Sequence, residues 1–208
     1  TVGMECYPCF EWLLKIVAPF LKRFPDVDVD VRRAFSFGGL QALHGYDIDV
    51  LITPDPLHLD AITYTPVFSY EQVLVMHSTH DLATKAFIAP RDLAQETLIS
   101  YPVETSRLDI FSQFLTPANA SVKSHKTIET TEIILQMVAA GRGVTALPKW
   151  LVDESQESEL LCCRPLGEEG LTKTLFVGHR KRTDTLGFID SFVEMAMAQG
   201  LKTNSPQQ

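Results

Sequence analysis

The sharpest chemical signal lies near the start of the chain, where Cys6 and Cys9 have the spacing of a dithiol pair. They stand between an expected strand at 2–4 and an expected helix at 10–24. A thiol at the start of a helix gains acidity from the helix N-terminus. Three interpretations stay open: two small residues that pack the helix start, lining of a ligand pocket, or a redox or metal-binding thiol pair. The central Tyr7-Pro8 is not typical of a redox motif.

A second group of side chains follows expected strands or begins expected helices. It supplies hydroxyls, charged groups and helix N–H groups, and consists of Ser36, Thr53, Asp55, Tyr101, Ser106, Arg107, Thr127, Glu129 and Thr130. Taken singly, such residues are more often helix caps than ligand contacts. Taken together, the hydroxyls and N–H groups suit a carboxylate, and Glu129 or Asp55 can receive an ammonium group. The set therefore favours an amino acid as ligand.

Motifs of common enzymes are missing from the sequence. It has no Gly-x-Ser-x-Gly motif and no P-loop, and Gly141-Arg142-Gly143 follows an expected helix as a stop signal. His77 and His80 have no neighbouring Cys or carboxylate cluster, so they do not predict a metal site. We therefore expect no catalytic residue, no metal and no cofactor. A thiol oxidoreductase that uses Cys6 and Cys9 is the alternative enzyme class.

Strand and helix patterns alternate along the chain, which predicts an α/β fold with mostly parallel sheets. Short apolar runs predict strands at 2–4, 27–31, 48–53, 62–66, 73–77, 98–101, 122–127, 144–147 and 175–179. Periodic apolar positions predict helices at 10–24, 40–44, 106–115, 132–140 and 186–197. We expect lobe I from 1–72 with 180–208 and lobe II from 73–179, joined by two crossing strands. A ligand cleft then lies at the carboxyl ends of the strands.

The charge balance restricts the partners of the chain. Its 208 residues have a formal net charge of −8, with 18 Lys and Arg against 26 Asp and Glu. This argues against nucleic-acid binding through this chain, because phosphate contacts need clustered basic residues. No apolar run approaches the ~18 residues of a membrane span. Four cysteines, two of them adjacent, predict a reduced, cytoplasmic protein that needs no disulfide.

Two longer stretches resemble the effector-binding domain of the LysR-type transcriptional regulators. They are 40–52 (LQALHGYDIDVLI) and 137–148 (MVAAGRGVTALP). His80-Asp81-Leu82-Ala83 is similar to a further motif of this family, with Asp81 in place of proline. The resemblance covers about residues 2–197. It implies two Rossmann-like lobes of the type II periplasmic-binding-protein kind, joined by two crossover strands.

Within this family the chain is similar to the regulators of methionine biosynthesis. The similarity lies in Glu5-Cys6-x-x-Cys9-x-x-Trp12-Leu13, in 101–109 and in 136–150. It implies homocysteine as effector, methionine-pathway genes as targets, and an N-terminal winged helix-turn-helix domain that is absent from this chain. DNA is then a partner only through that missing domain. A solute-binding protein of a transporter, which has the same two-lobed fold, is the alternative outside transcription.

The positions of the candidate side chains suggest how the ligand is bound, and the family resemblance suggests how a second copy is bound. We expect the homocysteine carboxylate at Ser106, Arg107 or Thr130, and its thiol toward Cys6, Tyr7 and Phe35. Effector domains of this family pair antiparallel, which predicts a homodimer or tetramer. The expected helix 10–24 of one copy then meets 106–115 of another, because Trp12, Phe20 and Phe24 give it more apolar surface than one lobe can bury.

Overall fold

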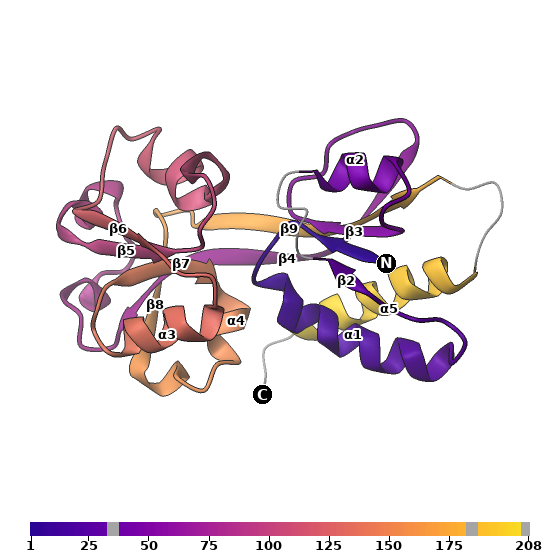
Figure 1. Cartoon of the computed structure of the whole chain (residues 1–208). Helices are drawn as coiled ribbons and strands as arrows, with labels where there is room; N and C mark the ends of the chain where they lie inside the picture. The colour runs from indigo at the N-terminus through magenta and orange to yellow at the C-terminus, as the bar shows by residue number, and fades with distance from the viewer. Residues whose placement is uncertain (33–37, 182–186, 205–208) are drawn as a thin grey trace. The chain divides into compact units, whose positions relative to one another are not determined.

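The computed structural model describes residues 1–32, 38–181 and 187–204 (Figure 1). The chain forms two compact units: unit 1 consists of Thr1–Ser69 and Lys173–Gln208, and unit 2 of Tyr70–Thr172. Two long strands, β4 (Ile62–His77) and β9 (Leu171–Arg180), run through both units. The unit limits fall inside these strands, where no linker or change of composition marks them in the sequence. The sequence pattern places the limits at 72/73 and 179/180.

Unit 1 is built on strands in the order β2-β1-β3-β9. β1 (Val2–Met4) is parallel to β2 (Val31–Arg32) and to β3 (Val50–Thr53), and β9 is antiparallel to β3. Every residue of β1 and β3 is buried, as expected for strands that are covered on both faces. The helices of this unit are α1 (Cys9–Arg23), α2 (Gly39–His44) and α5 (Gly187–Asn204).

Helices α1 and α5 lie side by side in unit 1 and bury aromatic side chains (Figure 1). Trp12 is fully buried, with its ring 5.6 Å from that of Phe68. Phe20 is 3% exposed and meets Phe192 of α5 edge to face at 5.5 Å. The expectation that Trp12 and Phe20 are left for a partner is therefore wrong, because α5 and β4 cover them. The large apolar side chains of α1 that are exposed are Leu14 and Leu21.

Unit 2 continues with strands in the order β4-β7-β5-β6, and β8 (Leu161–Pro165) also pairs with β4. β5 (Thr97–Ser100) is parallel to both β6 (Ser124–Thr127) and β7 (Val144–Pro148). Its helices are α3 (Thr131–Ala139) and α4 (Lys149–Asp153), with shorter turns at η1 (Asp81–Thr84), η2 (Pro90–Gln95), η3 (Thr105–Arg107), η4 (Ile110–Leu115) and η5 (Ser158–Leu160). The core gathers around Leu74, Met76, Leu98 and Val144.

Several local predictions differ from the structure. The strands expected at 62–66 and 73–77 form one continuous strand, β4, and the expected strand 27–31 is reduced to β2. The helix expected at 106–115 is a 3-10 turn, η3, followed by a π-helical segment, η4. Ser106 does not form the expected capping box, because Asp109 accepts a hydrogen bond from Gln113 Nε2 at 2.6 Å.

The last helix continues beyond its expected end at 197. α5 includes Gly200 and runs to Asn204, and its expected first residue, 186, lies outside the described residues. A Cβ on Gly200 would come within 2.6 Å of the carbonyl oxygen of Val67. Glycine is therefore required here for close packing of the helix on β4 and does not end the helix.

Two elements of unit 2, β8 and α4, are not predicted by the apolar pattern of the sequence.

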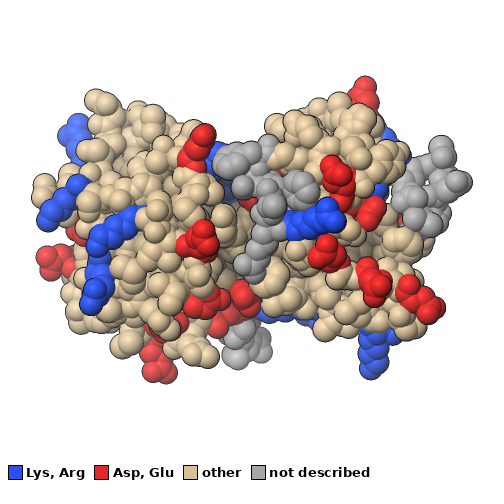
Figure 2. All heavy atoms as spheres, in the orientation of Figure 1, with Lys and Arg blue, Asp and Glu red and all other residues tan. Residues whose placement is uncertain are grey.

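The charged side chains do not form a basic surface on the face that Figure 2 shows. Lys and Arg side chains are scattered there among acidic and uncharged residues. Within the described ranges, no helix is long and apolar enough to cross a membrane.

Candidate functional site

Parallel strand pairing gathers the chemistry-bearing residues at one sheet edge in each unit. In unit 1 the ends of β1 and β3 are neighbours, because Met4 pairs with Ile52 and Glu5 N–H donates to the Ile52 carbonyl at 3.0 Å. In unit 2 the ends of β5 and β6 are neighbours, with Ser100 opposite Thr127. We call these the unit 1 edge (Cys6, Tyr7, Cys9, Thr53 and Asp55) and the unit 2 edge (Tyr101, Ser106, Arg107, Thr127, Glu129 and Thr130).

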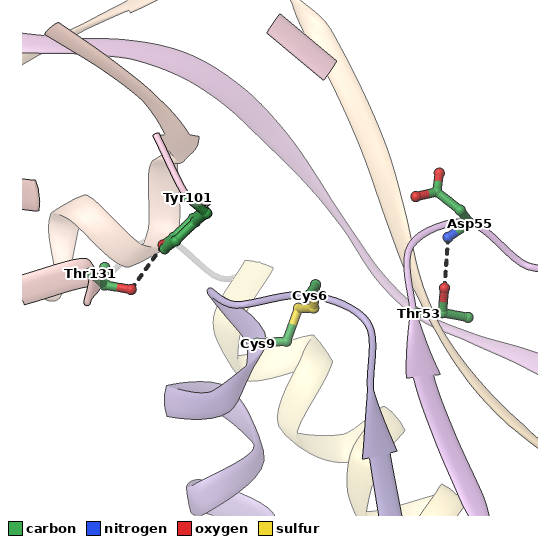
Figure 3. The surroundings of a disulfide bond; sticks show 6 residues. All are labelled: Cys6, Cys9, Thr53, Asp55, Tyr101 and Thr131. Atoms are coloured by element: carbon green, nitrogen blue, oxygen red, sulfur yellow. Dashed lines mark hydrogen bonds between the residues drawn. A yellow bond between two sulfur atoms is a disulfide. The ribbon is translucent and has the colours of Figure 1, made fainter. Parts of the chain in front are cut away.

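Cys6 and Cys9 are joined by a disulfide at the connection between β1 and α1 (Figure 3). The prediction of a fully reduced chain is therefore wrong for this pair. The turn into α1 holds the two Cα atoms 5.7 Å apart, within the usual range for a disulfide. Cys9 is the first residue of α1 and is 2% exposed, whereas Cys6 and Tyr7 are half-buried. Oxidised sulfurs do not act as thiolate metal ligands, so this state does not support the metal interpretation.

The other unit 1 candidates already have partners. Thr53, at the end of β3, is 1% exposed, and its Oγ1 accepts the backbone N–H of Asp55 at 3.1 Å (Figure 3). Asp55 is exposed, and its Oδ1 accepts from Lys173 Nζ at 2.6 Å. The Thr53 hydroxyl therefore holds the turn after β3, and the Asp55 carboxylate has a cation beside it. This favours Glu129 over Asp55 as the receiver of a ligand ammonium group.

The buried part of the unit 2 edge is held by hydroxyl hydrogen bonds. Tyr101, directly after β5, is 7% exposed, and its hydroxyl lies 2.8 Å from Thr131 Oγ1 on the first residue of α3 (Figure 3). Beneath it, Ser100 Oγ lies 2.7 Å from His125 Nε2 and donates to the Tyr101 carbonyl. Because a serine hydroxyl has one proton, His125 is the donor in the shorter contact. Burial lowers the pKa of His125, which keeps this imidazole neutral.

The outer part of the unit 2 edge carries open polar groups. Ser106, Thr127, Glu129 and Thr130 are exposed, and Arg107 is half-buried. Thr130 precedes α3 but makes no side-chain cap. Within the part of the chain that the structure describes, the side chains of the four exposed residues make no hydrogen bond. Their hydroxyls and carboxylate are therefore available to a ligand.

Some predicted positions are not placed, and some residues with a structural role at the edges were not predicted. Phe35 and Ser36 lie outside the described residues. The residues that sequence reasoning missed are those that support the edges, namely Glu5, Ser100, His125, Thr131 and Lys173. Thr131 follows a predicted cap and Ser100 lies in a predicted strand, so the local pattern marked their neighbourhood. Nothing in the sequence indicates that Lys173 reaches Asp55 across more than a hundred residues.

Comparison with known proteins identifies the class. The family model described as the LysR substrate binding domain matches residues 1–200. The chain therefore belongs to the LysR family of transcriptional regulators and is a regulatory, effector-binding domain of that family. Its fold is the predicted one, two Rossmann-like lobes of the type II periplasmic-binding-protein kind with two crossover strands.

Several of the similar proteins belong to one group within that family, the MetR regulators. The chain is 37% identical over 195 residues to the HTH-type transcriptional regulator MetR of Escherichia coli (strain K12), an alignment that covers 94% of this chain and 61% of the relative. The regulatory domain of MetR from N. meningitidis superposes with a TM-score of 0.89 at 29% identity, covering 97% of this chain and 93% of that one. The predicted similarity to MetR is confirmed.

A further structure bears on the cysteines. It is a mutant of the same N. meningitidis domain in which two cysteines, three positions apart, are replaced by serine. It superposes with a TM-score of 0.86 at 27% identity and covers 99% of this chain and 95% of that one. Cys6 and Cys9 have the same separation.

Proposed function

We propose that this chain is the homocysteine-sensing domain of a cytoplasmic regulator of methionine biosynthesis. The family membership and the MetR relatives support the regulatory class. The chain spans 61% of the length of the E. coli relative, which is an HTH-type regulator. DNA binding therefore belongs, in this proposal, to a helix-turn-helix domain outside the chain.

The observation that carries the ligand proposal is the polar surface of the unit 2 edge. Thr130 offers a hydroxyl beside the start of α3, where N–H groups favour a carboxylate, and Ser106 offers an exposed hydroxyl within η3. Glu129, exposed in the same loop as Thr130, offers a carboxylate to an ammonium group. The unit 1 edge adds sulfur and the half-buried ring of Tyr7, which suit the thiol end of homocysteine.

Calorimetry on this chain tests the ligand. We expect saturable binding of L-homocysteine and much weaker binding of L-methionine, whose S-methyl group needs extra room. Equal affinity for the two, or no heat at millimolar homocysteine, would reject the assignment. A binding preference for one arrangement of the lobes of about 1–3 kcal/mol is enough to change DNA affinity 5- to 150-fold.

The proposal includes a homodimer or tetramer. Leu14 and Leu21 are 45% and 40% exposed on one side of α1, which leaves an apolar stripe for the 106–115 segment of another copy. This stripe replaces the buried Trp12 and Phe20 as the basis of the prediction. Sedimentation at micromolar concentration should give a dimer, whereas a strict monomer at ~100 µM would exclude this contact in the domain alone.

The disulfide is the single observation that favours a second candidate, a thiol oxidoreductase. Such an enzyme needs both cysteines to cycle in turnover with a dithiol reductant and a protein disulfide. We expect no turnover above that of an unrelated disulfide protein in an insulin-reduction assay.

A further inference from the structure

The Cys6–Cys9 disulfide is an electrophile, and the proposed effector is a thiol. A disulfide sulfur reacts with a thiolate by exchange, without any additional oxidant or reductant. The inference below rests on the proposed function, since it concerns how homocysteine is recognised. It adds a covalent step to a site so far described by hydrogen bonds and charge alone.

The two sulfurs are not equivalent. Cys6 is half-buried in the connection after β1, whereas Cys9 is 2% exposed at the first position of α1. An incoming thiol therefore has better access to Cys6. The N-cap residue of this 15-residue helix is Pro8. Its side chain makes no hydrogen bond to the backbone N–H groups of the first turn.

The same asymmetry defines the leaving group. Negative charge is stabilised at a helix N-terminus by the backbone N–H groups and the helix dipole. A thiolate on Cys9 is therefore more stable than one on Cys6, and the sulfur with the more stable thiolate leaves faster. Access and leaving-group stability both select attack at Cys6.

We propose that homocysteine is sensed by thiol–disulfide exchange at Cys6. The homocysteine thiolate attacks Cys6 Sγ, a new S–S bond forms between them, and the Cys6–Cys9 bond breaks. The electron pair of the broken bond goes to Cys9 Sγ, which leaves as a thiolate, and the proton that the homocysteine thiol released goes to solvent. One disulfide is exchanged for another, so no net oxidation occurs. Return attack by Cys9 on Cys6 expels homocysteine and makes the signal reversible.

This chemistry gives a second reason for discrimination against methionine. Methionine is homocysteine with a methyl group on sulfur, and its thioether has no thiolate to exchange. 2-Mercaptoethanol has a thiol but lacks the amino-acid end of homocysteine, so it tests recognition of the ligand apart from its reactivity. Exchange also changes the covalent link next to Glu5, whose Oε1 accepts the N–H of Gly39 at the start of α2 at 3.1 Å.

Mass mapping of the oxidised chain tests the step. The free thiols of Cys162 and Cys163 are first blocked with N-ethylmaleimide, and a few equivalents of L-homocysteine are then added. Trapping with excess iodoacetamide at neutral pH, followed by acidification, should place one homocysteine on Cys6 and the new label on Cys9. We expect adduct formation at least about tenfold faster than with 2-mercaptoethanol, because bound homocysteine has a raised effective concentration.

Variants and analogues separate this inference from the proposed function. Cys6→Ser and Cys9→Ser should form no adduct, while Cys162→Ser, the matched control, should react as the unchanged chain does. An adduct on Cys9, or equal rates for the two thiols, would overturn the inference. The inference would also be overturned if homoserine, in which a hydroxyl replaces the thiol, bound as tightly as homocysteine and homocysteine formed no adduct. That last result would leave the proposed function intact, whereas failure of both ligands to bind would reject the proposed function itself.

Discussion

The two sheet edges show how one fold prepares two different surfaces from the same strand-to-helix connection. At the unit 1 edge the polar groups are satisfied within the chain, by the Cys6–Cys9 disulfide, the turn at Thr53 and the Asp55–Lys173 ion pair. At the unit 2 edge, hydrogen bonds hold only the buried layer, Tyr101 with Thr131 and Ser100 with His125. Its outer hydroxyls and Glu129 are exposed. Unit 2 thus offers open polar contacts, whereas unit 1 offers a disulfide at the start of a helix.

The largest expected effect is loss of an outer hydroxyl at the unit 2 edge. Ser106→Ala and Thr130→Val should each weaken homocysteine binding by about 1–3 kcal/mol, roughly 5- to 150-fold, because a carboxylate oxygen enclosed in the complex loses its donor. Calorimetry gives the affinities. Ser121→Ala, at an exposed serine elsewhere in unit 2, is the control and should leave binding unchanged. Unchanged affinity in both site variants would remove the hydroxyls from the site.

Replacing each of the two candidate carboxylates by its amide should have unequal effects on homocysteine affinity. Glu129→Gln should weaken binding about tenfold, because a charge-assisted hydrogen bond to the ligand ammonium is lost. Asp55→Asn should change affinity less than about threefold, because the Asp55 carboxylate, which is 58% exposed, already pairs with the largely buried Lys173. Affinities from the same titration check both values. A larger loss for Asp55→Asn would place the ammonium group at the unit 1 edge.

Low pH should reduce the stability of the folded chain through His125, which lies beneath the unit 2 edge. Burial lowers the pKa of this side chain from 6.5, so the unfolded chain takes up the proton more readily than the folded one. The stability that depends on neutral His125 is complete above pH 6.5 and is lost as the pH falls below it. Urea unfolding at pH 7.5 and 5.5 should show a smaller acid loss in His125→Gln, which keeps a donor for Ser100. Equal losses in both proteins would contradict this support.

A similar comparison distinguishes the two cysteine pairs. Burial raises the pKa of Cys163 to about 11, although Lys149 nearby favours its thiolate. Cys163 and Cys162 are free thiols on β8, and neither of them begins a helix. The difference indicates that reactivity follows from the place in the fold rather than from the presence of a cysteine.

Much of this arrangement is predictable from the sequence, and the remainder depends on contacts between distant residues. The position of Thr53 at a strand end and of Thr130 at a helix start follow from local apolar patterns and turn residues. The disulfide needs the 5.7 Å Cα separation at the start of α1, which spacing allows but does not require. The Asp55–Lys173 and Ser100–His125 contacts join segments far apart in the chain, so no local pattern could indicate them. The burial of Phe20 likewise depends on Phe192 of α5.

Amide hydrogen exchange of this chain, with and without L-homocysteine, tests the central claim most directly. The account predicts slower exchange at both edges, in the segments around 6–10 and 101–107 and around 127–132, with little change along β8. Protection at neither edge in the presence of saturating homocysteine would contradict the claim that this domain senses it. Protection at the unit 2 edge alone would contradict the part assigned to the Cys6–Cys9 turn.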